Sequence, residues 1–191
     1  MAIKTFTTGE VLTASDTNTY LANSGLTYIT QVTQTSGTNL DITSCFSATY
    51  DAYRIVCTDL RLSAAALISA TLLVGSTPAA ANITWASTRF DYAANAWNFA
   101  RGTTDTFVRG VSVGTVTNAG GFIFDVINPN LPQRTVIQAV GTDPRGTTGY
   151  MIINTNGLIE NTTAYNGLRL FVDSAPTYVN MKATVYGYRI S

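Results

Sequence analysis

Turn-forming residues recur at short intervals after Gly25, and the runs between them have the composition of β-strands. This spacing predicts nine strands, over residues 26–35, 51–62, 66–75, 107–116, 121–127, 134–140, 150–154, 167–173 and 177–191. Three of these runs alternate apolar and polar residues, so that one face of each strand is apolar. The apolar faces comprise Phe122, Phe124 and Val126, then Leu168, Leu170 and Val172, then Val179, Met181, Ala183 and Val185. Alternation with one apolar face predicts two sheets packed face to face.

The connections between the expected strands favour a jelly-roll sandwich. Residues 128–132 contain two prolines, which cannot donate to a strand ladder, so we expect this segment to cross between the sheets. Residues 141–149 and 174–176 are expected turns. Eight or nine strands with long crossings fit a jelly roll better than an up-and-down barrel. We therefore predict an all-β fold with one jelly-roll-like two-sheet β-sandwich over residues 26–191.

Residues 1–25 are built differently from the rest of the chain. They combine an extended arm, a turn at Gly9 and Glu10, and one short helix that Thr13 would begin as N-cap, with Asp16 as its capping-box partner. Gly25 stands where a glycine in the left-handed conformation ends a helix. A helix this short is unstable alone. We therefore expect residues 1–25 to be a docking arm that attaches the β-sandwich to a larger assembly.

Charge and hydropathy limit the classes of partner. Eleven basic and eleven acidic side chains cancel, and charged residues make up 12% of the chain, about half the usual share. Such a weakly charged surface is poorly protected against association, so we expect partners to cover much of it. No basic run is available to follow a phosphate backbone, and no apolar run is long enough to span a membrane. We therefore expect no nucleic acid, no membrane and no signal peptide.

The residue types in the chain allow few catalytic or metal-binding functions. The chain has no histidine, which removes the common nucleophile systems and nearly all zinc sites. Asp91 and Asp105 form the one carboxylate pair in a suitable region, and nothing in their spacing requires them to be close. Cys45 and Cys57 are expected to be buried free thiols, although they could also pair across a hairpin. We predict no enzyme, no metal and no cofactor.

Aromatic residues concentrate in residues 85–101, which we interpret as a loop region. Aromatic faces beside arginine and aspartate suit a sugar ring or a protein partner. The candidate patch comprises Trp85, Arg89, Asp91, Tyr92, Trp97 and Arg101. Either this patch recognises a host-surface glycan, or its aromatics pack between subunits or cap the end of the sandwich. We favour packing.

Three blocks of the chain resemble virion proteins of tailed bacteriophages. Residues 6–21 read FTTGEVLTASDTNTYL and resemble the N-terminal segment that recurs in tail, fibre and head-decoration proteins. Residues 50–60 (YDAYRIVCTDL) and 121–140 (GFIFDVINPNLPQRTVIQAV) resemble the strand blocks that follow it. The resemblance also points to a jelly roll, and it implies a protein that is assembled into a virion in the host cytoplasm.

Two functions are compatible with that resemblance. The first is a homotrimeric capsid cement or decoration protein, whose arm binds the major capsid protein at joints between capsomers and stabilises the head. The arm residues expected to dock are Ile3, Phe6, Val11, Leu12, Tyr20 and Leu21. The alternative is a tail- or head-fibre protein whose aromatic segment recognises a host glycan. The missing coiled shaft between arm and body favours cement.

Overall fold

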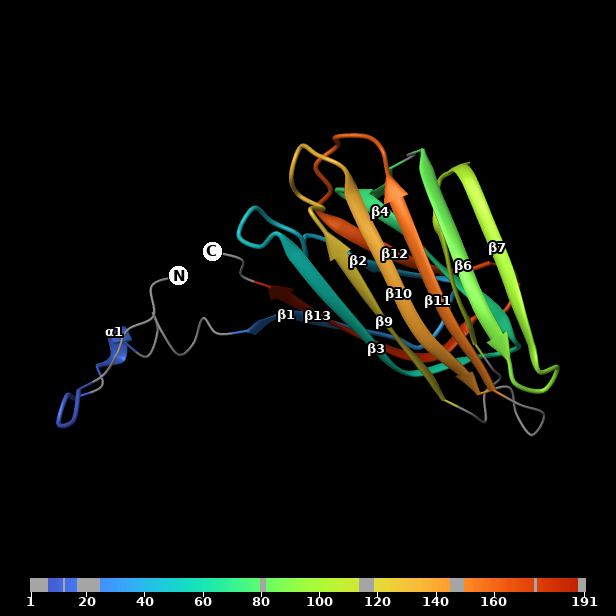
Figure 1. The fold of residues 1–191 in the computed structure, drawn as a ribbon, viewed down its shortest axis with the longest axis horizontal. Helices are drawn as coiled ribbons and strands as arrows, with labels where there is room; N and C mark the ends of the chain where they lie inside the picture. The colour runs from blue at the N-terminus through green and yellow to red at the C-terminus, as the bar shows by residue number, and fades with distance from the viewer. Residues whose placement is uncertain are drawn as a thin grey trace.

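The computed structural model describes residues 7–11, 13–16, 25–79, 82–113, 119–144, 150–173 and 175–188. These residues form an all-β protein with two sheets, and the five-stranded sheet lies behind the eight-stranded sheet in Figure 1. No helix in this part of the chain is long and apolar enough to cross a membrane.

The eight-stranded sheet has the order β1-β13-β3-β9-β10-β11-β6-β7. Its strands are β1 (Leu26–Gln34), β13 (Tyr178–Tyr188), β3 (Ala52–Leu62), β9 (Gly120–Ile127), β10 (Thr135–Pro144), β11 (Tyr150–Ile159), β6 (Ile83–Asp91) and β7 (Ala96–Asp105). The five-stranded sheet has the order β2-β12-β4-β5, with β8 also paired to β4. Its strands are β2 (Asn39–Ile42), β12 (Gly167–Val172), β4 (Ala66–Val74), β5 (Thr77–Pro78) and β8 (Val108–Val113).

Four antiparallel pairs are nested along the chain. The outermost joins β1 to β13, the next β2 to β12, the third β3 to β9 and the innermost β4 to β8. Strands β5 to β7 are inserted between β4 and β8, and strands β10 and β11 between β9 and β12. The inserted strands β10, β11, β6 and β7 extend the eight-stranded sheet beyond β9.

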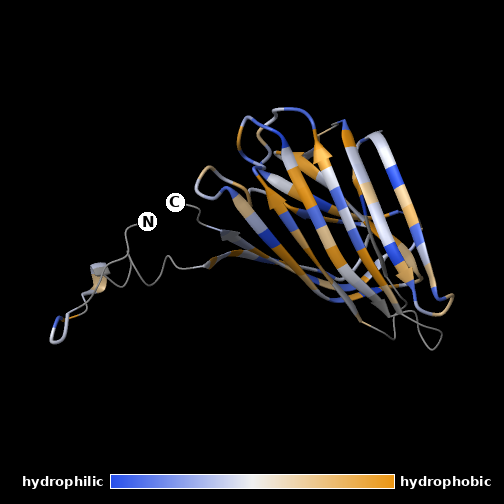
Figure 2. Cartoon of the chain, viewed as in Figure 1, coloured by the Kyte–Doolittle hydropathy of each residue, from blue (hydrophilic) through white to orange (hydrophobic). Residues whose placement is uncertain are grey.

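One apolar core contains side chains from both sheets. Ile55 and Phe124 enter it from the eight-stranded sheet, and Ile68, Leu168 and Leu170 enter it from the other, all of them fully buried. The alternation predicted for β9 and β12 is confirmed, because the residues of the predicted apolar faces are buried and the residues between them are not. Figure 2 shows the same alternation of apolar and polar residues along the strands of the eight-stranded sheet.

The prediction for the last strand is wrong at one position. Met181, Ala183 and Val185 are buried, whereas Val179 is 40% exposed. The pairing of β13 with β3 shifts register on both sides of Asn180. Such a bulge adds a residue and turns the preceding side chains to the other face, so Tyr178 is buried in place of Val179.

The segment expected to cross between the sheets instead connects neighbours in one sheet. Strands β9 and β10 flank residues 128–132 and pair with each other. Asn128 adopts a positive φ of 59° and donates its backbone N–H to the Asp51 carbonyl, while the Thr135 hydroxyl donates to the Asn128 carbonyl. These bonds hold residues 128–132 beside the eight-stranded sheet, so β10 pairs with β9 in the same sheet. Strand β10 also continues to Pro144, so residues 141–144 are strand and not the expected turn.

The arm is described in two short pieces. A turn joins the Thr7 carbonyl to the Glu10 N–H, with Gly9 at φ 89°, so the predicted turn is confirmed. Strand β1 is preceded by Gly25, at φ 99°. Helix α1 is described over Ala14–Asp16, directly after Thr13. The docking residues Ile3, Phe6, Leu12, Tyr20 and Leu21 lie outside the described residues, and Val11 is 79% exposed.

Candidate functional site

Residues 85–101 form a β-hairpin and not the loop region that the sequence suggested. Strands β6 and β7 pair from Ile83 with Asp105 to Asp91 with Ala96, and Asn95 at φ 47° lies in the turn between them. Strand β7 is an edge of the eight-stranded sheet. Successive side chains of a strand point to opposite faces of the sheet. The residues of the predicted patch are therefore divided between the two faces of the hairpin.

Trp85 belongs to the core and is 5% exposed. Its indole Nε1 donates to Asp105 Oδ2 at 2.5 Å, across the strand pair. The residue opposite Trp85 is Gly102, where a Cβ would overlap both the indole and the Asp105 carboxylate. Trp85 is therefore a buried structural residue and is removed from the candidate patch.

The outer face of the hairpin carries the exposed aromatic residues. Trp97 is 62% exposed and Phe99 is 77% exposed. The ring of Phe90, which pairs with Trp97 across the strands, lies 5.2 Å from the Trp97 ring between centroids. Arg101 is exposed on the same face, and Tyr92 is 70% exposed in the turn. This outer aromatic face, defined as Phe90, Trp97 and Phe99, can stack on a flat partner.

The apolar surface continues beyond the hairpin onto the neighbouring strands. Ile152 on β11 stands opposite Phe90 and is 57% exposed. Val140 on β10 and Ile123 on β9 are opposite each other, and both are exposed. Apolar residues thus recur on the outer face of five adjacent strands, β9, β10, β11, β6 and β7, and apolar clusters on the surface of a folded domain mark interaction surfaces.

The inner face of the hairpin carries polar residues instead. Arg89 and Ser87 alternate with the outer residues, and their cross-strand partners on β7 are Asn98 and Ala100. A cavity of about 300 Å³ lies beside them. Its lining also includes Ile153 of β11 and, from the five-stranded sheet, Leu67 of β4 and Arg109 of β8. We call it the two-arginine cavity.

The two carboxylates considered for catalysis are kept apart by the register. Asp91 is at the turn end of β6, where its Oδ1 accepts the backbone N–H groups of Ala93 and Ala94. Asp105 is at the opposite end of the hairpin, bonded to Trp85. Among the described residues, no three His, Cys, Asp or Glu residues come together as a ligand set for a metal ion.

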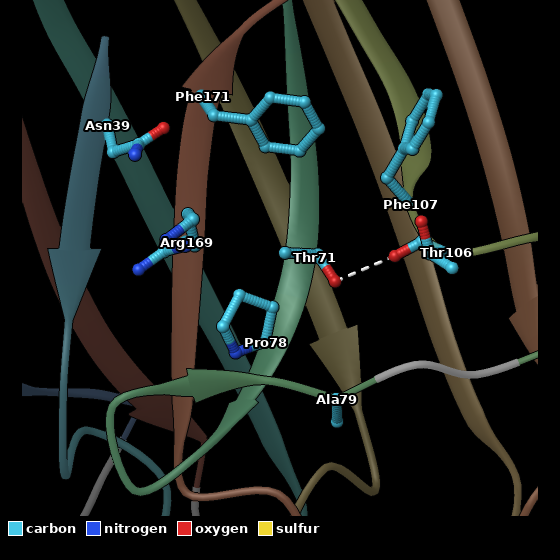
Figure 3. A pocket seen from close by; sticks show the side chains of 8 residues that line it. All are labelled: Asn39, Thr71, Pro78, Ala79, Thr106, Phe107, Arg169 and Phe171. Atoms are coloured by element: carbon cyan, nitrogen blue, oxygen red, sulfur yellow. Dashed lines mark hydrogen bonds between the residues drawn. The ribbon is translucent and has the colours of Figure 1, made fainter.

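A second cavity, of about 370 Å³, lies on the outer face of the five-stranded sheet (Figure 3). Figure 3 shows Phe171 and Phe107 on one side of it and Pro78 on the other, with a hydrogen bond from the Thr71 hydroxyl to the Thr106 carbonyl. Its cation, Arg169, already binds the Asp41 carboxylate through two bonds of 2.6 and 2.7 Å. That pairing raises the pKa of Arg169 and neutralises its charge locally.

Both cysteines are free and buried. Burial raises the pKa of the Cys45 thiol to about 12, and it also raises the pKa of Cys57. A protonated, enclosed thiol is a poor nucleophile. These two residues therefore act as small apolar groups of the core.

Comparison of the chain with known protein families, curated proteins and solved structures finds no match. Of the predicted patch, the structure brings Trp97, Arg101 and Tyr92 to the outer surface, and it directs Arg89 into a cavity. Sequence reasoning missed Arg109, Ser87 and Asn98 as neighbours of Arg89, since only the strand register brings them together.

Proposed function

We propose that the chain is a structural protein of a tailed-bacteriophage virion, a cement or decoration protein that binds the major capsid protein at joints between capsomers. One observation carries this proposal: an exposed arm precedes the two-sheet β body in the chain. All described side chains in residues 7–11 and 13–15 are exposed, and Figure 1 draws this part of the arm apart from the sheets. An exposed valine on such an arm gains from burial against a partner.

We infer further that the body is a jelly-roll sandwich. A jelly roll is one long antiparallel hairpin wrapped into two sheets, so its first strand pairs with its last and each following pair is nested inside. The nested pairs β1 with β13, β2 with β12, β3 with β9 and β4 with β8 support this assignment. Viral capsid domains use this architecture repeatedly.

A homotrimer is part of the same proposal. The apolar area that runs from Trp97 through Ile152 and Val140 to Ile123 supports it, because burial between subunits would remove these side chains from water. In a cyclic trimer, three weak arms act together, and their combined affinity exceeds that of one arm by orders of magnitude. Binding only to the assembled shell then stabilises the shell by mass action.

The test is binding to phage heads that lack the protein. The full chain should co-sediment with the heads, and electron microscopy should show regular added density over the shell. Deletion of residues 1–25 should abolish binding while the body stays folded. Val11→Asp should weaken binding, whereas the matched control Val74→Asp, at an exposed valine of the body, should not. Normal binding by the truncated body would refute the arm as anchor.

A receptor-binding role at the tail is the second candidate, and the outer aromatic face of Phe90, Trp97 and Phe99 favours it. In that case the arm would attach the protein to the tail, and the hairpin would face a host glycan. Copy number separates the two functions, since a cement protein is present in hundreds of copies per particle and a tail part in far fewer. Density confined to the tail would favour the receptor-binding role.

A further inference from the structure

We propose that the two-arginine cavity binds the carboxylate of an acidic sugar. The site lies on the β-sheet body, is separate from the arm, and goes beyond the cement function. Arg89 reaches the cavity from β6 in the eight-stranded sheet, and Arg109 reaches it from β8 in the other sheet. Two guanidinium groups that line one small cavity repel each other unless an anion lies between them.

The protein supplies little negative charge of its own here. Among the described residues, Arg89 has no acidic partner and makes no hydrogen bond through its side chain, although it is half-buried. Arg109 forms one ion pair, with 3.7 Å between its Nε and Asp173 Oδ2, so one carboxylate stands against the two guanidinium groups. The nearest acid on the same face of β6, Asp91, is engaged by the turn. The cavity thus has a positive excess, in contrast to the neutralised Arg169 site.

Neutral hydrogen-bonding groups next to the arginines can bind the hydroxyl groups of a sugar ring. Asn98 is directly opposite Arg89, and its side-chain amide has no partner among the described residues. The Ser87 hydroxyl accepts a hydrogen bond of 2.9 Å from Thr155, which leaves the hydroxyl proton of Ser87 available to a ligand. An amide and a hydroxyl beside two arginines can bind ring hydroxyls and a carboxylate together.

The size and rim of the cavity favour a single sugar ring. A volume of about 300 Å³ is at the lower end of the range for small-ligand sites. Phe99 borders the cavity, but the alternation of β7 directs its ring to the outer face, so the apolar lining comes from Leu67, Ala100 and Ile153. Apolar side chains beside a few polar groups are the usual composition of a small-ligand site. Bare phosphate would use the arginines but not these apolar groups.

Glucuronate and glucose are the matched probes, because they differ only in the carboxylate. Titration calorimetry and ligand-observed NMR on the full chain should show glucuronate binding that weakens as salt is raised, with glucose at least about tenfold weaker. Arg89→Gln and Arg109→Gln should each weaken glucuronate binding by about ten- to a hundredfold. Arg101→Gln, on the outer face of the same hairpin, is the control and should leave the affinity unchanged.

Equal binding of glucose and glucuronate, or an Arg101→Gln effect as large as that of Arg89→Gln, would overturn the proposal. Inorganic phosphate is the third probe, and phosphate binding as tight as glucuronate binding would overturn the sugar assignment. Circular dichroism checks that each variant is folded, and Arg89→Lys, which retains the charge but not the planar fork, should have an intermediate affinity. Capsid binding is measured separately, so failure here is distinguishable from failure of the cement function.

Discussion

The Trp85 indole donates a 2.5 Å hydrogen bond to the Asp105 carboxylate, and the space for that bond exists because residue 102 has no side chain. Trp85 and Gly102 are directly opposite each other on β6 and β7. The bond satisfies the indole N–H inside the core, where an unpaired donor would be costly. It also attaches the edge strand to its neighbour by a side-chain contact in addition to the backbone ladder.

Gly102→Ala should therefore destabilise the protein. The new methyl group would overlap the indole and the carboxylate, and overpacking of this kind costs about 1–3 kcal/mol. Urea denaturation measures the loss. The neighbouring exposed position provides the control, since Thr103→Ala should change the free energy of unfolding by less than about 0.5 kcal/mol. Equal effects of the two substitutions would contradict the role of Gly102.

Val185→Asp should prevent stable folding. Val185 is fully buried in β13, and an unpaired carboxylate there has no hydrogen-bonding partner, so we expect a loss of about 4 kcal/mol or more. Val179→Asp is the matched control on the same strand, because the bulge leaves Val179 40% exposed. Its cost should stay below about 1 kcal/mol. Thermal unfolding followed by circular dichroism distinguishes the two variants, and a similar loss in both would contradict the bulge.

Trp97→Ala tests what covers the outer aromatic face. If the face is a subunit contact, the variant should keep its fold but dissociate at higher protein concentration than the wild type, with a loss of about 2 kcal/mol in assembly. Light scattering after gel filtration measures this change. Tyr92→Ala, in the exposed turn of the same hairpin, is the control. An intact oligomer with reduced adsorption to host cells would instead support the receptor-binding candidate.

The folded protein should resist thiol reagents at pH 8. Both cysteines are buried, and the raised pKa values leave almost no reactive thiolate. Labelling with a chromogenic disulfide reagent should therefore wait for unfolding. Ala64→Cys, at an exposed position, should react at once in the folded state. Rapid labelling of the wild-type protein under the same conditions would show that Cys45 or Cys57 is accessible.

Stability should fall as the pH rises above about 9. The unfolded Cys45 thiol loses its proton from its ordinary pKa of 9.0, whereas the folded thiol keeps it up to about 12. Between these values the folded state binds more protons, so unfolding becomes easier by up to about 1.4 kcal/mol per pH unit for each buried thiol. Urea titrations at pH 8, 9.5 and 10.5 measure this slope. Cys45→Ala should make the slope less steep, with the buried Cys57 thiol still contributing, and an equal slope in that variant would contradict the assignment.

The sequence predicted the regular strands well where burial alone decides the pattern. Phe122, Phe124 and Val126 alternate with less buried residues and all enter the core, as expected. The prediction failed at Val179, because a bulge changes the face of a strand without leaving a mark in the hydropathy pattern. Whether a proline-containing segment changes sheets depends on long-range pairing, and residues 128–132 do not encode it locally.

The hairpin of β6 and β7 was missed for a different reason. Its aromatic residues Trp97 and Phe99 face outward, while polar residues such as Ser87 and Asn98 face inward, which reverses the usual pattern of a strand. Composition therefore identified an aromatic segment, but it indicated neither the strand structure of the segment nor which of its aromatic residues are exposed. Arg89 and Arg109 line the same cavity only because the two sheets pack together there. No local sequence pattern predicts this proximity.

The inserted strands have a consequence for how this protein can change over generations. In the sequence, strands β6 and β7 are inserted between β4 and β8, and strands β10 and β11 are inserted between β9 and β12. None of the four nested pairs therefore includes an inserted strand. Recombination that replaced the β6–β7 hairpin would exchange Arg89, Trp97 and Phe99 together while every nested pair kept its register. A population could thus acquire a new surface specificity in one genetic step and keep the four nested pairs, as long as the new hairpin fills the core positions of Ile83 and Trp85.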